Sequence, residues 1–205
     1  MSFDLILLIG AIGLGAMLQV GIGIGFSIIV GPLMFVQIGT QAAVPLLLLL
    51  NVVVSVIAVP GTVRATDWPV VKSAALACVV GILAGIAIYP LFSEAMVLAI
   101  AGGLLVIGAL STVLPASAAG KRAFLPICGL SGLATVWAAT PGPLMALGLI
   151  LSDYPAAIVR KLVQPIALIG YSVAFGLHAI GGFEMQPMVP LFVVVTVLAV
   201  WPAVG

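Results

Sequence analysis

Apolar residues along this chain fall into seven long blocks separated by short polar segments. A helix needs about 20 apolar residues to cross the hydrocarbon core of a membrane, and five of the blocks have roughly that length. Because the blocks are continuously apolar, we predict membrane-spanning helices and an all-α polytopic membrane protein. The blocks are residues 3–36, 41–63, 69–91, 95–114, 124–151, 162–183 and 187–204.

The blocks at 3–36 and 124–151 are too long for one crossing. As straight helices they would measure roughly 51 and 42 Å, against a hydrocarbon core of about 30 Å. Each also contains residues that destabilise a helix near its middle: three alternating glycines at 21–25 in the first, and Thr140-Pro141-Gly142-Pro143 in the second. One interpretation is two long, tilted, kinked helices. The interpretation that we favour is two discontinuous elements, each a short helix, a break at membrane depth and a second short helix.

The composition supports the membrane assignment. Charged residues make up 5% of the 205 residues, against roughly 25% in an ordinary soluble domain, and the mean hydropathy is +1.47. A soluble fold needs a polar exterior, so a soluble enzyme and a disordered segment are excluded. The net charge of +1 provides no basic surface for a nucleic-acid partner. Cys78 and Cys128 lie inside apolar blocks and are predicted to be small buried hydrophobic residues.

The placement of charge indicates how the chain crosses the membrane. If each overlong block enters and turns back, all six basic residues fall on one side, and Asp4, Glu94 and Glu184 fall on the other. If each block crosses once, the basic residues are divided between the two sides. Cytoplasmic loops concentrate Lys and Arg, so we predict two re-entrant segments in a multi-pass protein of the cell (inner) membrane, with the N-terminus outside and residue 205 in the cytoplasm. The six basic residues, all predicted to lie in loops, are Arg64, Lys72, Lys121, Arg122, Arg160 and Lys161.

The two overlong blocks align with each other at an offset of 117 residues. The breaks coincide, as do the polar loops that follow them and the spans after the loops. In the re-entrant arrangement the two units start on opposite sides, which is the inverted repeat of many secondary transporters. We therefore predict a single transmembrane domain over 1–205, with repeats at about 1–118 and 122–205, the second without a counterpart of the fourth segment. The matched glycine pairs are Gly15 with Gly132, Gly25 with Gly142, and Gly31 with Gly148.

Four segments carry a resemblance to a known family. They are residues 10–15 leading into 21–32, residues 129–132 leading into 140–143, the loop 64–68, and the glycine pair Gly81 and Gly85. In these segments the chain resembles the sulfite exporter (TauE/SafE) family over nearly its whole length. The resemblance implies transport of sulfite, organosulfonates or related small sulfur-containing anions. Two features depart from the family pattern: the second break has Thr-Pro-Gly-Pro in place of a glycine cluster, and the usual last helix is absent.

An anion near the middle of a membrane needs charge compensation. With the basic residues in loops, the available source is helix N-termini, whose unpaired N–H groups carry about half a positive charge. Broken helices place such ends at membrane depth, so we predict that the two breaks face each other and bind the anion. The alternative is close helix packing through small residues. The predicted binding residues are Gly21, Gly23, Gly25 and Ser27 from the first break and Thr140, Pro141, Gly142 and Pro143 from the second.

Isolated polar residues within apolar blocks are further candidates. Gln19, Asn51 and Gln164 each need a polar partner in hydrocarbon, and they either line the substrate path or join helices by hydrogen bonds. The same two interpretations apply to Tyr171 and Ser172, deeper in the span of Gln164. Trp137, three residues before the second break, either shapes the site or packs between helices. Gly81 and Gly85 are predicted to form a helix-packing face.

Ser131 and His178 suggest a different function. The residues around Ser131 are similar to the nucleophile motif of rhomboid-type intramembrane serine proteases, and those after His178 to their histidine motif. A hydrogen-bonded Ser–His pair can carry out acyl transfer, although the single histidine of the chain leaves the family's upstream histidine motif unfilled. An anion channel is a third alternative, because re-entrant segments also build pores.

The function that we favour from the sequence is a secondary transporter that works by alternating access. It would not be an enzyme and would use no metal or cofactor. Its expected partners are a small anion and the lipid bilayer; a proton or sodium coupling ion and a homo-oligomer are both compatible with this interpretation. His178 could couple transport to protons, since histidine titrates near neutral pH, but its position near Glu184 favours an interfacial, structural role.

Overall fold

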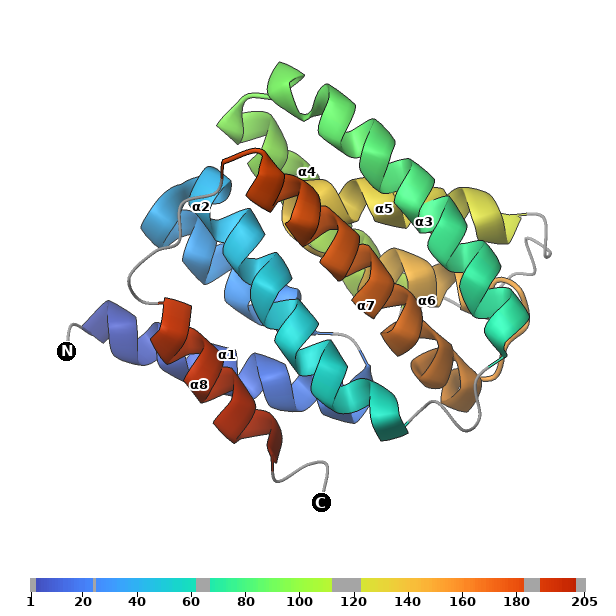
Figure 1. Cartoon of the computed structure of the whole chain (residues 1–205), viewed down its shortest axis with the longest axis horizontal. Helices are drawn as coiled ribbons and strands as arrows, with labels where there is room; N and C mark the ends of the chain where they lie inside the picture. Colours follow the sequence, from blue (N-terminus) through green and yellow to red (C-terminus); the bar gives the residue numbers. More distant parts are fainter. Residues whose placement is uncertain (1–2, 24, 62–66, 112–122, 183–188, 202–205) are drawn as a thin grey trace.

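The chain folds into a bundle of helices, seen in a computed structural model that describes residues 3–23, 25–61, 67–111, 123–182 and 189–201 (Figure 1). Within those residues the regular structure is entirely helical, as predicted. The α-helices are α1 (Phe3–Ile22), α2 (Phe26–Ala58), α3 (Trp68–Ile88), α4 (Glu94–Ser111), α5 (Phe124–Ala138), α6 (Gly142–Ile150), α7 (Ala156–Ile180) and α8 (Val189–Val200). Two short 3-10 turns, η1 (Val59–Gly61) and η3 (Tyr89–Leu91), follow α2 and α3.

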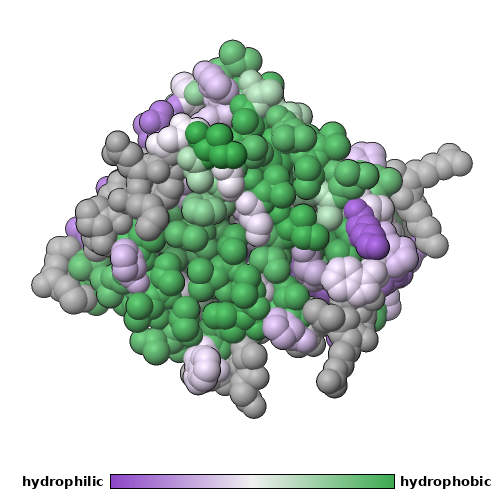
Figure 2. All heavy atoms as spheres, in the orientation of Figure 1, coloured by the Kyte–Doolittle hydropathy of each residue, from purple (hydrophilic) through white to green (hydrophobic). Residues whose placement is uncertain are grey.

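Four of the described helices, α1, α2, α3 and α7, are long and apolar enough to cross a membrane. Their outward faces carry large apolar side chains that are more than half exposed, such as Leu14, Leu76 and Val80. Figure 2 shows one such apolar face across the molecule, with hydrophilic residues toward its edges. Since burying these side chains against lipid removes apolar area from water at roughly 25 cal/mol per Å², the fold is compatible with a multi-pass membrane protein.

The first overlong block is discontinuous. Helix α1 ends at Ile22, and α2 begins at Phe26, because Gly23 (φ 95°) and Gly25 (φ 137°) adopt backbone conformations that other residues rarely reach. After this break, residues 26–38 of α2 fold back along α1. The Gln37 side chain donates a hydrogen bond to the Asp4 carbonyl oxygen (3.4 Å), so the broken element enters and leaves at the same end of the bundle.

A second reversal follows at Gly39 inside α2. Gly39 has φ 74° and ψ 162° and separates a first half at 26–38 from a second half at 40–58. The Glu94 carboxylate accepts a hydrogen bond from the Thr40 N–H (3.2 Å), which places an anion at the positive end of the new helical half. The predicted span at 41–63 is therefore the second half of α2, starting one residue earlier and ending at Ala58.

The second overlong block is also discontinuous. Helix α5 ends at Ala138, followed by Ala139 in the left-handed conformation (φ 51°), and α6 begins at Gly142. Pro141 cannot donate a backbone hydrogen bond, which favours the break. Phe124 at the start of α5 lies in one cavity with Ser152 and Tyr154, which follow α6. This element too returns to the end from which it started.

Charged residues mark the two ends of the bundle. The end with Asp4, Gly39 and Glu94 is called the acidic end below. The opposite end, called the basic end, holds the first turns of α3 and α7 with Lys72, Arg160 and Lys161, together with Asp67 and Asp153.

The prediction that all six basic residues lie in loops is wrong for Lys72, Arg160 and Lys161. Lys72 lies in α3, which begins at Trp68. Arg160 and Lys161 lie in α7, which begins at Ala156, directly after Pro155, rather than at 162. Long basic side chains at helix ends can extend toward water while their stems stay on apolar surface. Arg64, Lys121, Arg122, Glu184, and residue 205 lie outside the described residues.

Glycine contacts hold the second broken element against α3. A Cβ on Gly81 of α3 would collide with the Gly129 carbonyl oxygen of α5, and one on Gly132 would collide with the Cys78 carbonyl oxygen. The backbones of α3 and α5 therefore touch, as the predicted packing face at Gly81 and Gly85 requires. Helix α3 also packs on α7, while α8 packs on α1 and α2. Cys78 and Cys128 are free and buried, as predicted.

Candidate functional site

A small cavity lies where the two helix breaks meet. It has a volume of about 10 Å³ for the centre of a water molecule, which is about the least space that holds one water. We call it the break cavity. None of its described lining residues is charged. They are Gln19, Gly25, Ser27, Ile28, Thr140, Gly142, Pro143 and Tyr171.

Two helix N-termini face the break cavity. Helix α2 begins at Phe26 and α6 at Gly142, and neither N-cap residue supplies a side-chain hydrogen bond to its helix. The first N–H groups of a helix have no partner within the helix. One of them, the Phe26 N–H, donates to the Gln19 side-chain oxygen (3.2 Å). The cavity therefore lies in the positive field of two helix ends.

Neutral polar side chains join the two breaks directly. The Ser27 hydroxyl donates a 2.6 Å hydrogen bond to the Ala139 carbonyl oxygen, which links the first break to the second. Asn51 donates to the Ser27 hydroxyl oxygen (2.7 Å) and accepts from the Gln19 side-chain nitrogen (3.2 Å). Gln164 of α7 donates to the Gln19 carbonyl oxygen (2.9 Å). All four of these polar side chains are at most 5% exposed, so they hold the two breaks in one buried network.

Two buried polar atoms at the breaks have no hydrogen-bond partner. They are the Thr140 hydroxyl, on the wall of the break cavity, and the side-chain oxygen of Gln164. Thr140 is 5% exposed. An unpaired buried hydroxyl costs about 1–3 kcal/mol, and a bound water or ligand is the usual explanation for such a group. The hydroxyl is therefore free to donate to an occupant of the cavity.

Arg160 covers the first break from the basic end. Its guanidinium donates a 2.8 Å hydrogen bond to the Val20 carbonyl oxygen near the end of α1. Its stem lies against Gly23, where an added Cβ would come within 3.1 Å of the Arg160 Cγ. A glycine is therefore favoured at position 23 for two reasons: the backbone has a positive φ, and the Arg160 side chain packs against it.

The structure brings six of the twelve predicted site residues to the break cavity: Gln19, Gly25, Ser27, Thr140, Gly142 and Pro143. Asn51 and Gln164 bind Gln19 without lining the cavity. Gly21 is exposed in the last turn of α1, and nothing lies near the position of its Cβ. Gly23 faces Arg160. Trp137 packs between helices, where its indole nitrogen donates to the Gly85 carbonyl oxygen (3.4 Å) and its ring meets Phe92 edge to face. Pro141 is the N-cap of α6.

Two lining residues lie outside the predicted set. Ile28 resembles every other apolar residue of its helix, so no sequence pattern singles it out. Tyr171 is not in the predicted binding set, but as a polar group within an apolar span it is among the further candidates, beside Gln164.

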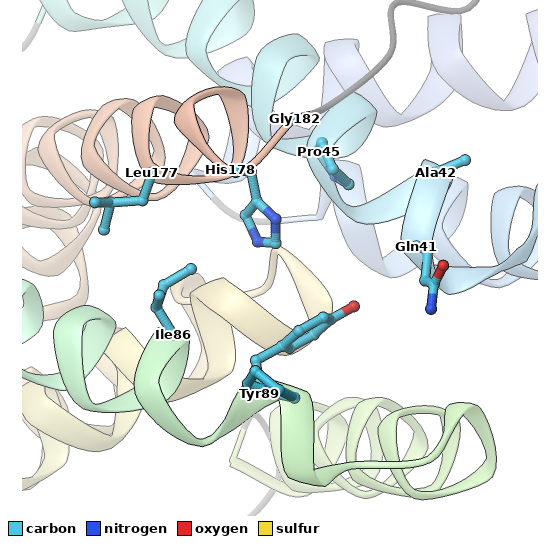
Figure 3. A pocket seen from close by; sticks show the side chains of 10 residues that line it. Gln41, Ala42, Pro45, Ile86, Tyr89, Leu177, His178 and Gly182 are labelled. Atoms are coloured by element: carbon cyan, nitrogen blue, oxygen red, sulfur yellow. The ribbon is translucent and has the colours of Figure 1, made fainter.

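A much larger cavity, of about 530 Å³, opens at the acidic end (Figure 3). We call it the vestibule. The second half of α2 contributes Gln41 and Pro45 to its wall, and the end of α3 contributes Ile86 and Tyr89. Helix α7 contributes His178, whose ring meets the Tyr89 ring edge to face, with centroids 5.7 Å apart.

The Ser–His pair that a protease would need is not formed. The Ser131 hydroxyl is fully buried and lies 4.0 Å from the Cys78 sulfur. The His178 Nε2 atom has no hydrogen-bond partner in the described structure, and the hydrogen-bonding group near the ring is the Val136 backbone. The geometry therefore provides no general base for Ser131.

The fold and the site together define a class of protein. It is an all-helical bundle with four membrane-length helices among its described residues, and two helix breaks that meet at a buried, uncharged polar cavity. Those residues contain no cluster of three or more His, Cys, Asp or Glu side chains that could hold a metal ion. No protein-family model, curated protein or solved structure matches this chain.

Proposed function

We propose that the protein is an integral membrane transporter for a small anion, which binds between the two helix breaks. The observation that carries the proposal is the meeting of two helix N-termini at one buried cavity. Unpaired N–H groups and the free Thr140 hydroxyl offer an anion hydrogen-bond donors without a fixed positive charge. The resemblance to the sulfite exporter (TauE/SafE) family favours sulfite, an organosulfonate or a related sulfur-containing anion as the substrate.

The size of the break cavity requires a conformational change during transport. A space for about one water is too small for a sulfonate, so the two breaks must separate before an anion enters. The Ser27–Ala139 hydrogen bond joins the breaks, and Arg160 covers the first break from the basic end. The structure thus has the features of a contracted state in an alternating-access cycle.

The packing of the helices supports an inverted repeat. A shift of 117 residues carries α1 onto α5, the second half of α2 onto α7, and α3 onto the segment containing α8. When the two repeats exchange places, α3 corresponds to α8, α5 to α1, and α7 to the second half of α2. The contact of α3 with α5 then corresponds to that of α8 with α1, and the contact of α3 with α7 to that of α8 with α2. All four of these helix pairs are in contact. With the Lys- and Arg-bearing end in the cytoplasm, the acidic end would face outward from the inner membrane.

A transport assay on liposomes containing the purified full chain tests the proposal. We expect saturable uptake of sulfite, methanesulfonate or thiosulfate under an imposed ion gradient. The variant Thr140→Val should weaken anion affinity by about tenfold, because a hydrogen bond to a charged group contributes about 1.5–3 kcal/mol. Its thermal stability should not fall, since the hydroxyl has no protein partner.

The matched control is Thr196→Val in α8. The Thr196 hydroxyl is buried and donates to the Phe192 carbonyl oxygen of its own helix, away from the break cavity, so anion affinity should be unchanged. If none of the three anions moves under any gradient, the transport proposal fails. If they move equally well in both threonine variants, the proposed site is wrong. Flux that rises without saturation would favour an anion channel.

A further inference from the structure

We infer that His178 is a proton-binding site coupled to the anion in the break cavity, so that one proton and one anion bind cooperatively. The inference rests on the proposed function and identifies its coupling ion. It also assigns a role to the vestibule, because the proposed anion site at the breaks does not involve that cavity.

His178 lines a cavity that is open to water. The vestibule opens at the acidic end, and Figure 3 shows the imidazole between the Tyr89 ring and the end of α7. The ring is partly buried, and its Nε2 atom has no hydrogen-bond partner. One nitrogen of a neutral imidazole is a proton acceptor. The Nε2 atom itself is buried in this structure, so exchange of a proton with the vestibule requires a small shift of the ring, but no described Nε2 hydrogen bond has to break.

Two features near His178 would stabilise a positive charge on its ring, against the free-energy cost that partial burial imposes on the charged form. The residue lies in the last turn of α7, at the negative end of the helix dipole. The end of α3 also borders the vestibule, at Ile86 and Tyr89, and Glu94 lies close enough to Tyr89 to act on it electrostatically. The described residues of α2 and α5, the other elements beside the ring, contain no Asp, Glu, Lys or Arg.

The distance from His178 to the break cavity suits an electrostatic coupling. Tyr171, which lines that cavity, precedes His178 by seven residues on the same face of α7, or about 10 Å along the helix axis. Between them lies Ala174, which is fully buried. Opposite charges about 10 Å apart in a protein interior favour each other's binding by roughly tenfold. By linkage, the anion must strengthen proton binding by the same factor.

The coupling can be measured by methanesulfonate binding to the solubilised full chain between about pH 5.5 and 8, the range in which histidine titrates. Methanesulfonate keeps its single negative charge throughout this range, so only the protein titrates. We expect affinity to rise by about tenfold as the pH falls, at constant ionic strength. In His178→Gln, which cannot carry the charge, the affinity should stay near the high-pH value of the unaltered protein at every pH.

A second variant, Glu94→Gln, should shift the pH dependence of methanesulfonate affinity rather than abolish it. It keeps an oxygen acceptor for the Thr40 N–H but removes a negative charge near the vestibule. A proton on His178 should then be held less tightly, which moves the midpoint of the pH dependence to lower pH. A merely structural role for His178 would leave this midpoint unchanged.

The protonation of His178 can be followed directly, because it is the single histidine of the chain. Its imidazole resonance in isotope-labelled protein should titrate with a midpoint about one pH unit higher in saturating methanesulfonate than without it. A pH-independent affinity in the unaltered protein, or a pH dependence that survives in His178→Gln, overturns the coupling and leaves anion binding standing. Absence of binding at every pH overturns the proposed function together with the coupling.

Discussion

At the scale of single residues, neutral amides and hydroxyls rather than charged groups organise the centre of this protein. Asn51 is the residue on which the network depends, since it contacts Gln19, Ser27 and the Leu47 carbonyl oxygen. A polar side chain in such surroundings must have partners. Asn51 does not line the break cavity, so its role there is to position the residues that do.

Asn51→Leu should destabilise the fold by about 1–2 kcal/mol. The change leaves the Gln19 side-chain nitrogen buried without its acceptor, and a buried unpaired donor costs free energy. Thermal unfolding in detergent measures the effect. The matched control is Gln37→Leu. The Gln37 amide is exposed, and its described hydrogen bond to the Asp4 carbonyl oxygen is long (3.4 Å), so this change should alter stability little. Equal melting temperatures for the two variants would contradict the importance of the network.

At the scale of helices, the fold depends on where a helix stops and on where two helices touch. The stops at Gly23–Gly25 and at Ala139–Pro141 create the N-termini of α2 and α6. The contact between α3 and α5 depends on Gly81 and Gly132, where the backbones approach too closely for any side chain. Because α5 carries the second break, this contact also fixes the depth of the site.

Gly132→Ala should destabilise the protein by about 1–3 kcal/mol, since overpacking against a backbone carbonyl cannot be relieved by a rotamer change. Gly102→Ala in α4 is the matched control, because nothing lies within 4 Å of its Cβ position. That change should be neutral or stabilise by up to about 1 kcal/mol through helix propensity. Unfolding measurements on both variants test the contact, and a stable Gly132→Ala would show that α3 and α5 do not touch there.

At the scale of the whole molecule, both broken elements return to the end from which they start, and they start at opposite ends. The first enters from the acidic end, as the contact between Gln37 and Asp4 shows. The second enters from the basic end, where Phe124 and Tyr154 share a cavity. This arrangement lets both breaks reach a common cavity inside the bundle.

Labelling with a membrane-impermeant thiol reagent tests the arrangement. Single cysteines at exposed Asp4 and Gln37 should react in intact cells, whereas those at exposed Lys72 and Asp153 should react only after permeabilisation. The basic end is expected in the cytoplasm, and the two native cysteines are buried. A protein without added cysteines is the control. Opposite accessibility for Asp4 and Gln37 would show that the first element crosses rather than returns.

Much of the fold could be predicted from the sequence. The lengths of the apolar blocks and the two breaks follow from local properties: hydrophobicity, the backbone freedom of glycine and the missing donor of proline. The return of both elements is predicted from the placement of the charged residues. The start of α7 was misplaced because adjacent basic residues such as Arg160 and Lys161 are typical of loops, whereas here they lie in a helix and the Arg160 stem packs on Gly23. The sequence could name Gln19, Ser27 and Thr140 as candidates, but it could not show that they meet at one cavity.

The sequence by itself determined that this chain forms apolar helices, and it located the two places where helices break. Only the tertiary structure determined which residues face the break cavity, so that Tyr171 lines it while Gly21 and Trp137 do not, and that His178 lies in an open vestibule. The physical reason is that helix lengths and breaks depend on neighbouring residues. The direction in which a side chain points into a site depends instead on how each helix is rotated and on which distant segments pack against it.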